Sequence, residues 1–223
     1  DDRFTLAQNC ITGDECWFVY VHVDRAAYDH LLELRLQDGS AFRTNAHTCC
    51  GTVMAAYNLD TGEHRELFRI DYPIHHVHGY GARGLAFSHI PGDLYGMGIA
   101  HIDRPGYCIP RPQDAHGGKI IHHVPTAAGI AYELNFRQDG SWAGVLDPDS
   151  GCKTEFPVLP GTNHTGVDPL GRLLFYQVGA DRIQVMRAYD ADGDHDWLDL
   201  FGAWPTYGDG QKRHFHPRLV LGR

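Results

Sequence analysis

Histidine-bearing segments recur along this chain at an interval that few folds produce. Starting from His76, the next such segments carry His123, His164 and His214, which lie 47, 41 and 50 residues further on in turn. An apolar run follows the histidines in PIHHVHGYGARGLAFSH, KIIHHVPTAAGIAYEL and GTNHTGVDPLGRLLFY. A four-stranded β-propeller blade takes roughly 40–50 residues, so the repeat predicts a histidine at the start of the innermost strand of each blade. Those strand starts line the central funnel of a propeller.

The rest of the chain carries the pattern of antiparallel strands. Helical periodicity is scarce, and short runs rich in β-branched and aromatic residues alternate with Gly, Asp and Pro. Acidic turns that contain glycine follow several runs, at NLDTGE (58–63), DPDSG (147–151) and AYDADGD (188–194). The predicted strands cover 15–21, 30–36, 51–58, 84–88, 128–134, 172–177 and 182–187.

These patterns predict an all-β fold, a β-propeller of four-stranded antiparallel blades. At this period the 223 residues make about five blades, which we assign to a single domain over residues 1–223. The last histidine segment, 214–223, has the form of the first strand of a blade whose other strands are missing. We therefore expect the chain to cover part of a larger propeller.

Composition limits the classes of partner. No apolar run reaches the roughly 18 residues of a spanning helix, and Asp1-Asp2-Arg3 does not open a signal peptide, although a mature secreted form would look the same. The net charge of −9 and the lack of a long Lys/Arg cluster argue against nucleic acid. Six cysteines without a CxxC pair leave the compartment open. We expect no membrane partner, and the sequence does not fix the oligomeric state.

The C-terminal region resembles a known metal site. Gln211, His214 and His216 form the string Q-x-x-H-x-H-P, which resembles the metal-binding motif of the oligogalacturonate lyase family. The resemblance runs from about residue 50 to residue 223 and implies seven blades when the propeller is complete. In VLPGTNHTGVDPLGRLLF it implies a further metal-ligand histidine at His164.

The same resemblance implies a catalytic histidine, and one departure from it points to a related family. The segment GGKIIHHVPTAAGIAY is similar to the one that carries the family's catalytic histidine, here His122 or His123. The family's catalytic arginine aligns near Met97, where this chain has no arginine. Ulvan lyases are related propeller enzymes that use a tyrosine and a downstream arginine with histidines. Tyr95 and Arg111 are similar to that pair in spacing, which favours an ulvan-type substrate over an oligogalacturonate.

The resemblance implies a polysaccharide lyase that cleaves an acidic, uronate-containing polysaccharide or oligosaccharide by β-elimination. That reaction needs a group that neutralises the carboxylate, a base that takes the α proton, and an acid for the departing oxygen. Arg111 suits the first role because a guanidinium clamps a carboxylate in a bidentate fork. His123, or its neighbour His122, suits the base, and Tyr95 the acid. His78, on the preceding blade, is a supporting or alternative base.

The proposed metal ligands share a donor chemistry. His214 and His216 are two residues apart and would share one face of a strand, with Gln211 across the preceding turn and His164 one blade earlier. Imidazoles and an amide oxygen suit Mn²⁺ or Zn²⁺ better than Ca²⁺. We therefore expect a divalent metal cofactor.

Two other functions compete with a lyase. A propeller glycoside hydrolase would need paired carboxylates, whereas the Asp and Glu residues here concentrate in turns. A binding propeller would present aromatic side chains in its funnel and would use a metal for structure alone. The lyase interpretation favours a secreted or periplasmic protein, or a cytoplasmic one if the substrate is an oligogalacturonate.

Overall fold

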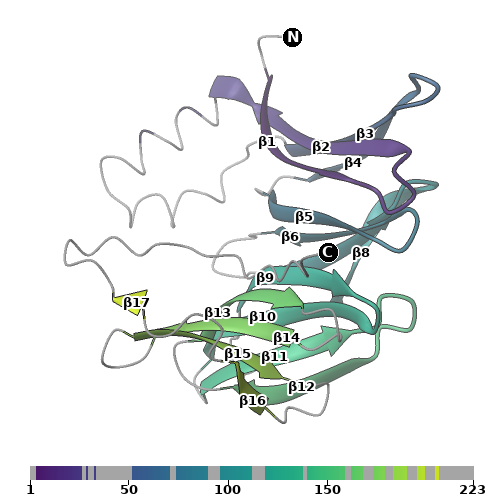
Figure 1. Ribbon diagram of the computed structural model, residues 1–223. Coiled ribbons are helices and arrows are strands. Elements are labelled where there is room, and N and C mark those ends of the chain that lie inside the picture. Colours follow the sequence, from purple (N-terminus) through teal and green to yellow (C-terminus); the bar gives the residue numbers. More distant parts are fainter. Residues whose placement is uncertain are drawn as a thin grey trace, which may run out of the picture. The chain divides into compact units, whose positions relative to one another are not determined.

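The fold is all-β and is seen in a computed structural model (Figure 1). The chain divides into two compact units, residues 1–114 and 115–223. The structure describes residues 4–26, 29, 33, 52–70, 74–89, 96–111, 119–137, 140–158, 162–167, 173–178, 183–189, 195–198 and 204–205.

The first unit holds two four-stranded antiparallel sheets, each with its strands in sequence order. The strands of the first sheet are β1 (Phe4–Ile11), β2 (Trp17–Asp24), β3 (Thr52–Asn58) and β4 (His64–Ile70). Those of the second are β5 (Ile74–Tyr80), β6 (Gly84–His89), β7 (Gly96–His101) and β8 (Arg104–Arg111). Strand β1 packs against β5, and β4 packs against β8.

The second unit repeats this arrangement. Its first sheet contains β9 (Lys119–Thr126), β10 (Gly129–Arg137), β11 (Gly140–Leu146) and β12 (Lys153–Val158). Its second contains β13 (Thr162–Val167), β14 (Leu173–Val178), β15 (Ile183–Tyr189) and β16 (His195–Leu198), with β17 (Trp204–Pro205) paired to β15. Strand β13 packs against β9 and β10. Four-stranded meanders that meet through their first strands are the blades of a β-propeller.

Most of the predicted strands are confirmed, to within a few residues at their ends. In the range 30–36 the prediction is wrong at Glu33, which has helical backbone, and the other residues of that range lie outside the described structure. The run LLELRL consists of good helix formers and lacks the β-branched and aromatic residues on which the strand prediction was based. Three of the four repeated histidines, His76, His123 and His164, lie on the first strand of a blade; His76 and His164 are near its start, as predicted, whereas His123 lies in the middle of β9. His214 lies outside the described residues.

Burial explains why these runs form strands. Strand β2 alternates between buried and half-buried residues along its whole length, whereas β3 and β7 are buried at nearly every position. Strands covered on both faces are apolar throughout, and strands with one wetter face alternate. The core of the first unit draws on both of its sheets, with Phe68 of β4 packed 5.2 Å from Phe87 of β6 between ring centroids.

Two of the predicted acidic turns are built alike in different blades. The Asn58 side chain accepts hydrogen bonds from the N–H groups of Asp60 and Thr61, and Asp147 does the same for Asp149 and Ser150. Each turn has a glycine four residues after its first residue, Gly62 and Gly151, with φ of +73° in both. A side chain with a Cβ rarely adopts this φ, which is why glycine stands there. The turns join β3 to β4 and β11 to β12, so they are equivalent parts of two blades.

Glycines of the third strands lie under aromatic rings of the second strands. Gly98 of β7 pairs with Phe87 of β6, and Gly144 of β11 pairs with Tyr132 of β10. A Cβ added at Gly98 would overlap the Phe87 ring, and one at Gly144 would lie 2.6 Å from the Tyr132 ring. An aromatic ring that covers a strand glycine leaves no room for a methyl group.

We expect Gly98→Ala to lower the free energy of unfolding by roughly 1–3 kcal/mol, because the added methyl group overpacks a buried site. Denaturant unfolding of the wild type, Gly98→Ala, Phe87→Leu and the double variant measures the effect and its cause. In the Phe87→Leu background the alanine should have a much smaller effect, because the ring it meets is gone. Equal effects in both backgrounds would show that the ring contact is not the cause.

Candidate active site

A one-residue irregularity recurs in the first strand of every described blade. Pairing with the second strand slips by one residue at position 7 of β1, 75 of β5, 121–122 of β9 and 164 of β13. A β-bulge of this kind breaks the strict alternation of side chains and re-aims those beside it, and bulges are frequent next to active sites. In three of the four blades the bulge contains a histidine: His75, His122 and His164. The histidine repeat in the sequence is therefore also a repeat of local backbone structure.

A side chain of β6 forms a hydrogen bond with the backbone of β5 beside its bulge. The Ser88 hydroxyl oxygen accepts a hydrogen bond from the backbone N–H of His76 at 3.1 Å, and Ser88 is fully buried. The rings of His76 and His78 stack with their centroids 6.3 Å apart. Residues two apart on a strand share a face, so these half-buried imidazoles form one surface of the blade.

At the bulge of β9 a histidine contacts a buried carboxylate. His122 Nδ1 makes a short hydrogen bond with Glu133 Oε1 of β10; the His122 side chain is 15% exposed and that of Glu133 only 1%. His123 pairs with Tyr132 and is 3% exposed. The Tyr132 hydroxyl donates to Glu155 Oε1 of β12 at 2.7 Å. The two neighbouring histidines therefore differ in both exposure and surroundings.

The other predicted catalytic residues lie at or beyond strand ends. Arg111 is the last residue of β8, where its backbone pairs with Met97, and its side chain is outside the described structure. Tyr95 lies outside the described residues, one position before β7 begins. In an antiparallel meander the start of β5, the start of β7 and the end of β8 share one edge of the sheet. That edge therefore holds Arg111 and the bulge of β5, and Tyr95 adjoins it in sequence.

The predicted metal ligands fall mainly outside the described structure. His164 is placed by its backbone at the bulge of β13, and Gln211, His214 and His216 lie outside the described residues. Among the residues that the structure does describe, no three His, Cys, Asp or Glu side chains are grouped as a metal site. The metal site stays a prediction.

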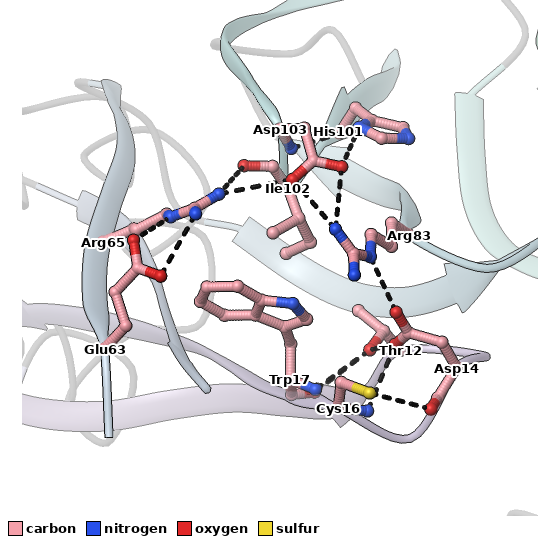
Figure 2. Close-up of polar contacts among 10 residues, drawn as sticks. All are labelled: Thr12, Asp14, Cys16, Trp17, Glu63, Arg65, Arg83, His101, Ile102 and Asp103. Atoms are coloured by element: carbon pink, nitrogen blue, oxygen red, sulfur yellow. Dashed lines mark hydrogen bonds and ion pairs between the residues drawn. The ribbon is translucent and has the colours of Figure 1, made fainter. Parts of the chain in front are cut away.

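The opposite edge of the first unit carries a charged network that joins its two sheets (Figure 2). Arg83, in the β5–β6 turn, contacts Asp14 of the β1–β2 turn at 2.7 Å and Asp103 of the β7–β8 turn at 3.2 Å. Arg65 of β4 contacts Asp103 at 3.3 Å, and its guanidinium lies 4.6 Å above the Trp17 ring. The network uses the turns at the far end of the strands from Arg111. We therefore interpret it as a structural clamp between the two blades.

Asp14 is the most strongly perturbed carboxylate of this clamp. Hydrogen bonds from the Thr12 hydroxyl and the Arg83 guanidinium lower the pKa of Asp14 from 3.8 to about 2. The charged form therefore stabilises the folded state at every pH above 3.8, and this contribution is lost as the pH falls from 3.8 through about 2.

We expect Asp14→Asn to melt at a lower temperature than the wild type at pH 7, with the difference shrinking as the pH falls towards 2. Thermal unfolding followed by circular dichroism at several pH values measures this. Asp149→Asn is the matched control, because Asp149 is an exposed turn carboxylate in the other unit. A melting difference that stays constant down to pH 2 would rule out the charge of Asp14 as its source.

Sequence reasoning missed Glu133, although the strand contains a signal for it. In GIAYEL, residues 129–134, Glu133 is the only charged residue, and the residues beside it, Tyr132 and Leu134, are fully buried. A carboxylate is rarely buried without a partner, so a lone acid in such a run indicates a specific contact.

Within the described ranges, no helix has the length and apolarity needed to cross a membrane.

Comparison with solved structures identifies proteins of the same fold. The chain is similar to an oligogalacturonate lyase in complex with manganese, with a TM-score of 0.71 and 15% identity over 92% of this chain and 54% of the lyase. Similarity to the oligogalacturonate lyase of Vibrio parahaemolyticus gives a TM-score of 0.73 and 15% identity over 89% of this chain and 55% of the lyase. In fold, the chain resembles the oligogalacturonate lyases. It spans about half the length of these two enzymes.

Other proteins share the fold more distantly. TolB from Acinetobacter baumannii matches with a TM-score of 0.53 and 8% identity over 87% of this chain and 43% of TolB. No protein-family model and no curated protein matches the chain. At these identities the likeness establishes the β-propeller fold, and the function has to be argued from the residues.

Proposed function

We propose that this protein is a polysaccharide lyase that cleaves a uronate-containing glycan by β-elimination, with an oligogalacturonate as the substrate class. The observation that carries the proposal is the set of histidines at the bulges of consecutive first strands, in a fold resembling two oligogalacturonate lyases. Those two structures favour the oligogalacturonate alternative over the ulvan-type substrate that the spacing of Tyr95 and Arg111 suggested. Ulvan remains the comparison substrate for the test.

The proposed chemistry breaks a C–H bond and a C–O bond of the substrate and makes one carbon–carbon double bond. A base from the pair His122 and His123 takes the proton on the carbon next to the carboxylate. The electrons left there form a carbon–carbon double bond as the bond to the glycosidic oxygen breaks. Tyr95 protonates that oxygen, Arg111 holds the carboxylate, and His78 supports the base. No water is consumed, so one product ends in an unsaturated uronate.

The backbone around Arg111 supports its role. The resemblance to oligogalacturonate lyases places an arginine near Met97, and the structure pairs Met97 with Arg111 on the neighbouring strand. Paired residues of an antiparallel sheet have their Cβ atoms about 4.5–5.5 Å apart. The Cβ atom of an arginine at position 111 therefore lies close to the Cβ position that an arginine at 97 would have.

A divalent metal belongs to the proposal, with His164, Gln211, His214 and His216 as its ligands. Three imidazoles and an amide oxygen suit Mn²⁺ or Zn²⁺, and one of the similar lyase structures holds manganese. A bound divalent ion would supply positive charge to a substrate oxygen. The bulge at His164 lies in the strand that packs against the strand of His122 and His123, which supports placing the metal beside the base.

Incubation with polygalacturonate, with short oligogalacturonates and with ulvan tests this function. A lyase produces a conjugated unsaturated uronate that absorbs in the ultraviolet, a glycoside hydrolase produces reducing ends without that absorbance, and a binding protein produces neither. We expect absorbance to rise with the galacturonates and to rise little with ulvan. Absorbance that rises with ulvan alone would reverse the substrate assignment, and reducing ends without absorbance would refute elimination.

A further inference from the structure

Glu133 is a buried acid that the proposed chemistry does not yet use. It lies in the middle of β10, and its side chain is 1% exposed. Moving a carboxylate out of water is unfavourable by several kcal/mol unless hydrogen bonds replace the water. Its contact with His122 Nδ1 crosses from β10 to β9, so it links the second strand of this blade to the first. A group buried at such a cost to stability is a candidate for a functional role.

The register of β9 against β10 places His122 beside Glu133. Ile120 pairs with Leu134 and His123 pairs with Tyr132, so residues 121 and 122 both lie opposite Glu133. Continued from the pair of His123 and Tyr132, the ladder sets His122 opposite Glu133, and residues that lie opposite each other share a face of the sheet. The bulge takes up the extra residue between Ile120 and His123, and the His122 ring contacts the carboxylate.

We propose that Glu133 is a positioning residue for His122, and that His122 is the base of the elimination. Glu133 Oε1 accepts a hydrogen bond from Nδ1–H, which fixes the ring orientation and selects the tautomer whose lone pair is on Nε2. Carboxylates orient functional imidazoles in this way in metal sites and in catalytic triads. The inference rests on the proposed function, since it names which member of the histidine pair does the chemistry.

The surroundings of His123 support this choice. His123 is 3% exposed and lies opposite Tyr132, whose hydroxyl donates a hydrogen bond to Glu155. A base has to reach the proton of its substrate, and the more exposed ring of His122 is better placed to do so. The Glu133 carboxylate contacts the ring of His122 and can orient it.

The experiment combines a spectroscopic and a kinetic readout on the same variants. Long-range ¹⁵N–¹H correlation spectra of the imidazoles report which nitrogen carries the proton, with His122→Ala used to assign the signals. We expect His122 to be protonated at Nδ1 in the wild type and to lose that preference in Glu133→Gln. The same variant should lose roughly 10–10²-fold in kcat on oligogalacturonate, with KM unchanged. Glu155→Gln is the matched control, since it removes a carboxylate from the same sheet that contacts Tyr132, and it should change neither readout.

The results that would contradict the role of Glu133 differ from the result that would contradict the proposed function. A wild-type His122 protonated at Nε2 would overturn the proposal, even if Glu133→Gln failed to fold. A Glu133→Gln variant with an altered tautomer and normal kcat would also overturn it, because orientation would then not matter to the rate. A protein without elimination activity on any uronate glycan would refute the proposed function instead. The tautomer measurement would still decide whether Glu133 orients His122.

Discussion

Replacing His122 with alanine is expected to lower the turnover of oligogalacturonate elimination by about 10²–10⁴-fold, the range typical for loss of a general base. The sheet should still form because it is held by its backbone ladder, but the melting temperature should fall, since the variant removes the hydrogen bond of the buried Glu133 carboxylate. Initial rates from the ultraviolet absorbance of the unsaturated product, with a thermal melt of each variant, measure both quantities.

His123→Ala is the internal comparison. Its side chain is 3% exposed, so its removal should lower the free energy of unfolding by roughly 1–3 kcal/mol and change turnover much less. If His123→Ala removed turnover at an unchanged melting temperature while His122→Ala stayed near normal, His123 would be the base, as the sequence alone first suggested.

Removing the divalent metal is expected to lower both elimination activity and the melting temperature. An ion that binds only the folded protein stabilises it by about 2.7 kcal/mol when present at one hundred times its dissociation constant. Treatment with a chelator should therefore lower the melting temperature, and adding Mn²⁺ back should restore both properties. His214→Ala should reproduce the effect of the chelator and should not respond to added metal.

His64→Ala is the matched control for the metal variant. His64 is exposed at the start of β4, where its ring contacts the Tyr20 hydroxyl at 2.6 Å. This variant should keep its response to chelator and to Mn²⁺. If the wild type contains no stoichiometric metal, and its activity and melting temperature are unchanged by the chelator, the metal assignment is wrong.

Features encoded within one strand or turn were predictable from the sequence. The turn that begins at Asn58 requires a side-chain acceptor followed by glycine, and both are visible in NLDTGE. The blade repeat was visible because the first strands of three blades, β5, β9 and β13, carry histidines. The strand prediction over 30–36 is wrong at Glu33, the one residue of that range that the structure describes. A short apolar run fits either secondary structure, and the residues here are good helix formers.

Features that depend on a partner strand were not predictable. A bulge exists only relative to the register of the neighbouring strand, so nothing in KIIHHVPT alone shows that residues 121 and 122 share one partner. The contact between Asp14 and Arg83 joins residues 69 apart in the sequence and belongs to the packing of two blades. Glu133 was visible as a charge in an apolar strand, but its partner was not.

The central claim is that this protein cleaves a glycan by elimination and not by hydrolysis, and the masses of the products test it most directly. An oligogalacturonate of defined length should be digested and both fragments weighed by mass spectrometry. Elimination consumes no water, so the masses of the two fragments should add up to that of the substrate, with the unsaturated fragment one water lighter than its saturated counterpart. Fragments whose masses add up to the substrate plus one water would contradict the account.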